Sequence, residues 1–237
     1  MSLAQSDGVA ANWLLKALSP EDYQRLLPHL ECVSLPLYHV IYEANNSIPY
    51  VYFPTSAMIS LVLTLMDGST IEVGIVGHKG MAGISVILGG TAETYRALVQ
   101  VAGEAIRLKA TVLQAEFDKG GELQKILLRY VQALFVQTSQ SVACNRFHTT
   151  EKRLARWLLL VADAISSDEF LLTQEFIGQM VGVRRAGVTV AAGNLAQLGL
   201  IRYSRGKIEI VNRPGLEGFS CECYGVIRNE FSRMLRQ

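Results

Sequence analysis

Five basic side chains, with no acidic residue among them, mark the stretch from Gly178 to Lys207. They are Arg184, Arg185, Arg202, Arg205 and Lys207. Cationic groups of this kind suit a polyanion, because each phosphate that they neutralise releases a condensed counterion. An arginine can also donate two parallel hydrogen bonds to the edge of a guanine. The chemistry predicted here is phosphate binding and base recognition.

These residues fall on a predicted helix, turn and second helix. The first helix starts at about Gln174, where Thr173 can cap it, and ends at Gly182, which can take the positive φ of a helix end. Gly178 lets the two helices approach closely. The second helix is predicted from about Arg184 to Leu198, with both neighbouring arginines at its start. A recognition helix presents such N-terminal residues to the major groove of duplex DNA.

A predicted β-hairpin follows the second helix. Apolar residues alternate with polar ones on either side of the turn at residues 204–207; they are Ile201, Tyr203, Ile208 and Ile210. This alternation around a glycine turn is typical of two paired strands. The basic tip suits a wing that contacts phosphate, so the order indicates a winged helix-turn-helix. The alternative is a small helical domain with a solvated basic face.

Charge is divided unevenly along the 237 residues. Residues 1–150 carry ten basic and twelve acidic side chains, whereas residues 151–237 carry twelve and nine. The C-terminal part is therefore the candidate for nucleic-acid binding, and the length favours two domains. No apolar run approaches the roughly 18 residues of a membrane span, and no signal peptide is evident. We expect a cytoplasmic protein without a membrane partner.

The first half of the chain predicts two short helices followed by closely spaced strands. The helices are expected at residues 12–18 and 20–30, and the strands at residues 38–42, 50–53, 58–66, 70–76, 96–101 and 105–109. Short strands separated by turn residues favour a compact β-sandwich or barrel. Glycines at every third position, Gly74, Gly77, Gly80 and Gly83, indicate sharp turns or a close approach of the backbone; a loop that cradles a ligand is the alternative.

A long helix is predicted to connect the two halves. Its apolar stripe contains Leu123, Leu127, Tyr130 and Leu134. The stripe is wider than is needed to cover one side of a β-domain. We therefore expect these residues to pack against a second copy of the helix. The alternative is a helix buried inside one chain. Another helix is expected from Glu151 to about Ala164, capped by Thr149 or Thr150.

The four cysteines are Cys32, Cys144, Cys221 and Cys223. Their spacing fits neither a zinc finger nor a disulfide scaffold, so we predict no metal site and reduced, partly buried thiols. Metal chelation or oxidation at Cys221 and Cys223, in what is predicted to be a C-terminal appendage, is the alternative. His29, His39 and His78 have no supporting motif and are expected to be packing or surface residues.

The layout resembles the Crp-Fnr family of bacterial transcription regulators. The resemblance is sharpest over residues 172–185, LTQEFIGQMVGVRR, with agreement at 153–158 and 199–201 and looser echoes at 52–54 and 80–83. It implies an α+β fold: an antiparallel, cyclic-nucleotide-binding-like β-roll of jelly-roll type at residues 1–117, a dimerisation helix at 118–148, and a winged helix-turn-helix with a helical extension at 149–237.

The resemblance also implies which residues contact DNA. The base-reading arginine falls on Arg185, and the other contacts fall on Gln174, Arg184, Gly187, Thr189, Arg205 and Lys207. Where many members have an acidic residue and a second arginine, this chain has Ala186 and Val190. The operator is therefore expected to differ, with shape readout and the wing contributing more of the specificity.

The effector pocket departs from the family as well. The resemblance places it at Gly80, Met81, Ala82, Gly83, Arg96 and Ala97. Members that bind cyclic nucleotides hold the ribose with an acidic residue where this chain has Met81 and Ala82. We expect no cyclic AMP binding and no iron-sulfur or haem sensor, and the sequence names neither effector nor cofactor.

The function expected is a homodimeric regulator that binds a double-stranded DNA operator, without catalytic residues. RNA polymerase and a small-molecule effector are further partners that the family suggests. The alternative is a ligand-responsive regulatory module that acts on a protein partner. An enzyme built on the β-roll is not favoured, because no cluster of histidine and carboxylate ligands is present.

Overall fold

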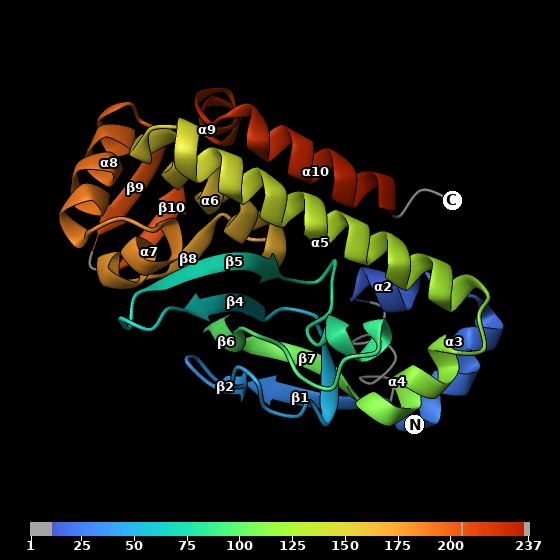
Figure 1. Cartoon of the computed structure of the whole chain (residues 1–237). Coiled ribbons are helices and arrows are strands. Elements are labelled where there is room, and N and C mark those ends of the chain that lie inside the picture. Colours follow the sequence, from blue (N-terminus) through green and yellow to red (C-terminus); the bar gives the residue numbers. More distant parts are fainter. Residues whose placement is uncertain (1–10, 205, 235–237) are drawn as a thin grey trace.

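The computed structural model describes residues 11–204 and 206–234. A β-roll forms one end of the molecule and a helical domain with a small sheet forms the other, and the long helix α5 runs along both (Figure 1). This is the α+β architecture expected from the sequence. Among the described residues, we find no helix both long and apolar enough to cross a membrane.

The β-roll consists of two antiparallel sheets. Its strands are β1 (Glu31–Leu35), β2 (Val40–Tyr42), β3 (Tyr50–Pro54), β4 (Met58–Thr64), β5 (Thr70–Val76), β6 (Arg96–Val101) and β7 (Gly103–Lys109). One sheet has the order β1-β7-β3 and the other β2-β6-β4-β5. The predicted strands are confirmed, and β1 is an additional one.

Short helices close the ends of the roll. They are α2 (Trp13–Lys16), α3 (Pro20–Leu26), the 3-10 helices η1 (Leu27–His29) and η2 (Ile84–Leu88), and α4 (Ala110–Phe117). The Ser19 hydroxyl accepts a hydrogen bond from the Asp22 amide at 3.1 Å, so the predicted start of α3 is confirmed. The second predicted helix ends in the 3-10 turn η1 and is shorter than expected.

Two long helices connect the roll with the C-terminal domain, and the second of them lies in the core of that domain. They are α5 (Glu122–Phe147) and α6 (Thr150–Ile165), and Thr149 caps α6. Three of the four repeated glycines, Gly74, Gly77 and Gly80, lie beneath these helices. A Cβ atom at Gly80 would stand 2.7 Å from the Tyr130 ring of α5, and one at Gly77 would stand 2.4 Å from the Ala164 carbonyl of α6. The close approach predicted for these glycines is therefore to the chain's own helices.

The C-terminal domain combines helices with a three-stranded sheet. Its elements are β8 (Glu169–Leu171), α7 (Gln174–Val181), α8 (Arg185–Gln197), β9 (Ile201–Ser204), β10 (Lys207–Ile210), α9 (Arg213–Phe219) and α10 (Glu222–Met234). The predicted hairpin is confirmed, and β8 pairs with β10 as a third strand.

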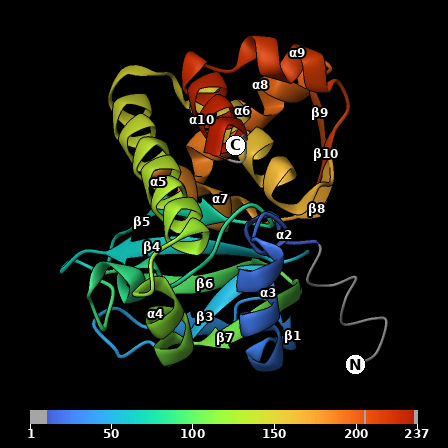
Figure 2. The ribbon, with the colours of Figure 1, turned by 90° about the vertical axis from the view of Figure 1, so that its right-hand side faces the viewer.

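The helix α10 is not an appendage. It returns along α5 (Figures 1 and 2), and its residues Tyr224, Ile227 and Met234 are buried. Met234 packs into the core of the β-roll, and the ring of Phe231 lies 6.4 Å from that of Tyr130. The sequence prediction missed this contact because the residues that cover α10 lie about a hundred positions earlier in the chain, and local patterns do not reveal such contacts.

Candidate nucleic-acid interface

One threonine starts α7, and two glycines shape the turn between α7 and α8. Thr173 accepts a hydrogen bond from the Phe176 amide at 3.2 Å, and Gly182 ends α7 with a φ of 68°. A Cβ atom at Gly178 would stand 2.8 Å from the Val183 carbonyl oxygen. Only glycine therefore allows this approach of the two helices, as the sequence predicted.

The recognition helix α8 presents its start to solvent. Arg184, which caps the helix, and Arg185 are exposed, as is Thr189 one turn later. The Thr189 hydroxyl donates to the Gln174 side chain at 2.8 Å, so the start of α7 and the first turn of α8 present their polar groups side by side. Four of the residues predicted to contact DNA are thus brought together by the fold. Gly187 lies between them and is half-buried.

Two basic side chains of the wing form ion pairs with carboxylates of their own chain. Lys207 forms an ion pair with Glu169 of β8 at 2.5 Å, and Arg202 pairs with Glu209 on the neighbouring strand. The hydrogen bond to Glu169 raises the pKa of Lys207 further above its usual value, so its charge is permanent at neutral pH. Arg205, the other predicted wing contact, lies outside the described residues.

The helix-turn-helix packs against the β2-β6-β4-β5 sheet of the β-roll. The rings of Phe176 on α7 and Tyr38, just before β2, lie 5.9 Å apart, and Ile71 of β5 lies close to Gly182. A groove of about 660 Å³ separates the β4–β5 hairpin from the turn, and both Arg184 and Arg185 line it. The start of the recognition helix therefore borders the β-roll.

Comparison with known proteins identifies the C-terminal domain. A Crp-like helix-turn-helix domain matches residues 152–219. The chain is 24% identical over 196 residues to a CRP-like cAMP-activated global transcriptional regulator from Mycobacterium tuberculosis, covering 80% of this chain and 88% of that protein. Residues 152–219 are thus a Crp-like helix-turn-helix domain, and the chain as a whole is similar to transcription regulators of the Crp-Fnr family.

Solved structures of the family share the whole fold. A Crp/Fnr-family regulator from Eubacterium rectale has a TM-score of 0.68 at 17% identity, with 87% of this chain and 96% of that chain covered. FixK2 from Bradyrhizobium japonicum has a TM-score of 0.66 at 16% identity, with 81% and 98% covered. The β-roll, long helix and winged domain of this chain thus follow a known architecture.

The interior of the β-roll is filled at the expected effector position. Met81, Ala82 and Ala97 are at most 1% exposed and belong to the hydrophobic core. The Tyr130 hydroxyl donates to the Met81 carbonyl at 2.8 Å and so ties this loop to α5. Gly83 takes a φ of 97° against Val51. The loop residues predicted to cradle an effector contact side chains of their own chain.

Arg96 and Glu93 lie three residues apart in the expected effector region. The Arg96 Nε atom is buried without a hydrogen-bond partner. The carboxylate of Glu93 is also buried and accepts a hydrogen bond from the Ser85 amide at 2.9 Å. Burial, helped by the Glu93 charge, raises the pKa of the Tyr42 hydroxyl well above its usual range.

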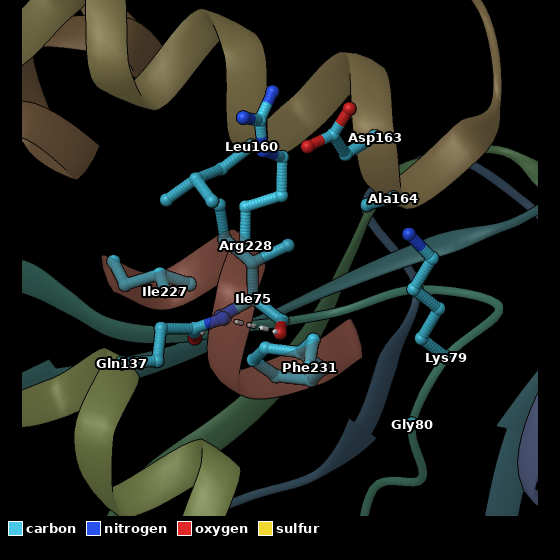
Figure 3. Close-up of a pocket in the computed structure, with 11 residues that line it drawn as sticks. Ile75, Lys79, Gly80, Gln137, Leu160, Asp163, Ala164, Ile227, Arg228 and Phe231 are labelled. Carbon is cyan, nitrogen blue, oxygen red and sulfur yellow. Dashed lines mark hydrogen bonds between the residues drawn. The ribbon is translucent and has the colours of Figure 1, made fainter. Parts of the chain in front are cut away.

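A small cavity lies where the β-roll meets α5, α6 and α10 (Figure 3). Gln137 of α5 bonds the backbone of Ile75 on one side, and Ile227 and Phe231 of α10 lie on another. Its volume is about 50 Å³, far below the several hundred Å³ of a typical small-molecule pocket. It has room for ordered water rather than for a nucleotide.

The predicted dimer residues need a correction. Leu123, Leu127, Tyr130 and Leu134 are at most 5% exposed and pack into the core of their own β-roll. They are therefore not available to a second chain. The apolar residues of α5 that remain exposed are Leu128, Phe135 and Val142, at 46%, 68% and 67%. The sequence prediction chose the wrong face because α5 is apolar on both.

The residues that join the two domains were also missed. The buried carboxylate of Glu72 on β5 accepts hydrogen bonds from Ser60 at 2.5 Å and from the Trp157 indole of α6 at 2.7 Å. A lone acidic residue at an inward position of a strand was the available signal, since a buried charge requires partners.

Proposed function

We propose that this protein is a homodimeric, sequence-specific DNA-binding regulator that does not respond to cyclic AMP. The observation that carries the proposal is the cluster of exposed Arg184, Arg185 and Thr189 at the start of the recognition helix, beside the half-buried Gln174 of α7. In this geometry Arg185 reads a guanine and the neighbouring polar groups hold phosphate. Gly187 lets the helix approach the sugar-phosphate backbone, and the wing adds Lys207 and Arg205.

The dimer would form through the uncovered face of α5. Leu128, Phe135 and Val142 are spaced by seven residues, which is the repeat of a two-helix seam. Figure 2 shows α5 at the edge of the molecule, with α10 on one flank only. Two chains joined along this seam would place two recognition helices in successive major grooves, roughly 34 Å apart.

A response to cyclic AMP is disfavoured by the chemistry of the roll. The relative from Mycobacterium tuberculosis is described as cAMP-activated, but this chain has the buried Met81 where the family places its ribose-binding acid. An effector, if one acts here, would shift the packing of the DNA-binding domain on the β-roll by binding one arrangement more tightly than another. RNA polymerase is a further partner for an activator of this family.

The test is an unbiased selection of oligonucleotides bound by the full-length protein, followed by titration of the selected site. We expect two related half-sites. Arg185→Ala should relax the preference at one base of each half-site, with a loss of about 1–3 kcal/mol. Arg129→Ala, an exposed arginine on α5, is the control and should leave the preference intact. Weak binding without sequence preference would instead support a module that acts on a protein partner.

A further inference from the structure

Three buried cysteines and one histidine converge where α5 ends and α10 begins. Cys144 lies in the last turn of α5, and His148 is the C-cap residue whose amide donates to the Cys144 carbonyl at 3.1 Å. Cys221 and Cys223 flank the start of α10. One ligand atom from each of the four residues lies within 4.8 Å of all the others.

The distances match those of a tetrahedral metal site. The sulfur atoms of Cys144 and Cys221 lie 3.5 Å apart, and the Cys223 sulfur lies 3.7 Å from His148 Nδ1. A tetrahedron with metal–sulfur bonds of about 2.3 Å places its sulfur atoms roughly 3.8 Å apart. The three thiols are at most 3% exposed and pack with one another, apart from the two large hydrophobic cores.

Groups around the cluster suit a bound cation. His148 Nε2 lies 3.4 Å from the Glu222 carboxylate, which leaves Nδ1 directed at the thiols. Histidine ligands are commonly oriented by a carboxylate in this way. The positive charge of Arg156, a buried residue whose Nε atom has no hydrogen-bond partner, acts on Cys144 and Cys223. A divalent ion with three thiolates carries one net negative charge, which this guanidinium would balance.

We propose that Cys144, His148, Cys221 and Cys223 bind one Zn²⁺ ion. Three thiolates and one imidazole in a closed tetrahedral set are typical of structural zinc. The ion would fasten the start of α10 to the end of α5, at the junction that leads into the DNA-binding domain. This site is separate from the proposed DNA contacts and does not depend on them. The prediction of no metal site considered cysteine spacing alone, whereas the fold pairs residues 144 and 148 with residues 221 and 223.

The first test is the metal content of untagged, full-length protein purified under reducing conditions. We expect one zinc per chain by inductively coupled plasma mass spectrometry. His148→Ala and Cys223→Ser should each lower zinc affinity by more than tenfold in competition with a chelator. Cys32→Ser is the matched control, because Cys32 is exposed and lies outside the cluster; it should keep the full zinc content.

A second test distinguishes a ligand role from simple misfolding. Metal-free, reduced protein given Co²⁺ should develop the visible absorption of a tetrahedral thiolate site. His148→Cys should restore a complete ligand set and retain zinc, whereas His148→Ala should not. A chelator should lower the melting temperature of the wild-type protein but not of His148→Ala.

Several results would overturn the proposal. They are the absence of both stoichiometric zinc and a cobalt spectrum, iron with acid-labile sulfide, or a Cys144–Cys221 disulfide in the freshly purified protein. Zinc content unchanged in a Cys144→Ser/Cys221→Ser double variant would also refute it. None of these measurements involves operator DNA. They therefore distinguish a wrong metal site from a wrong DNA-binding function.

Discussion

The Glu72 carboxylate on β5 accepts a 2.7 Å hydrogen bond from the Trp157 indole on α6. Both side chains are buried, and their bond joins the β-roll directly to the DNA-binding domain. Trp157 has its ring in the core of the second domain, together with Met58, Val62 and Ile75 from the strands of the roll. The two domains therefore share an apolar interface in which the Glu72 carboxyl is buried.

Titration of Glu72 should make stability depend on pH. Burial raises the pKa of Glu72 from 4.5 to about 7, although Ser60, Trp157 and Arg156 oppose the shift. The folded protein then binds the proton more tightly than the unfolded chain. Stability from this group is fully present below about pH 4.5 and falls as pH rises to about 7, by on the order of 3 kcal/mol at most.

Glu72→Gln should remove that dependence. The free energy of unfolding, measured by urea titration from pH 5 to pH 8, should favour the variant increasingly as pH rises. Glu104→Gln, which changes an exposed carboxyl on β7, is the control and should follow the wild-type profile. A constant difference between Glu72→Gln and the wild type across this range would show that Glu72 does not titrate there.

Replacing two residues of the exposed α5 face should separate the subunits. Leu128→Asp with Phe135→Asp is expected to give folded monomers with an unchanged circular dichroism spectrum and greatly reduced operator affinity, because neither side chain belongs to the chain's own core. Sedimentation equilibrium and circular dichroism would check this. Arg129→Asp, on another face of α5, should leave the oligomeric state unchanged. A dimer that survives the double substitution would place the interface elsewhere.

Gly187 and Gly193 offer a matched pair within α8. A methyl group at Gly187 would stand at an ordinary 3.8 Å from Val183, and at Gly193 it would meet no atom within 4 Å. Each glycine-to-alanine change should stabilise the helix by up to about 1 kcal/mol. Only Gly187→Ala should weaken operator binding in a fluorescence anisotropy titration. Equal affinities for the two variants would contradict the close approach proposed at Gly187.

Substitutions of Lys207 and Glu169, which form an ion pair, should have opposite effects on DNA affinity. Lys207→Ala should weaken binding to all sequences similarly and reduce the slope of log affinity against log salt by about one. Glu169→Gln should strengthen DNA binding. In the wild type, Lys207 must give up its ion pair with the Glu169 carboxylate before it can bind a phosphate, and the variant has no such ion pair to break. Filter-binding titrations at several salt concentrations would measure both. A loss confined to the selected site on Lys207→Ala would indicate base readout instead.

Local signals in the sequence determined most elements of the fold. Thr149 and Thr173 cap their helices, Gly182 ends α7, and alternating apolar residues form the strands of the roll and of the wing. These features depend on backbone conformation and on contacts within a few residues. The exposure of Arg184 and Arg185 could also be predicted from local sequence, because the turn directs the start of α8 outward.

Only the tertiary structure decided which residues cover one another. Periodicity marks the apolar faces of α5 but cannot say that one face belongs to the β-roll and the other is free, because both are apolar. Lys207 meets Glu169, and His148 meets Cys223, across segments whose separation along the chain carries no spacing signal. The candidate metal cluster and the domain interface therefore exist through long-range packing, which no window of the sequence contains.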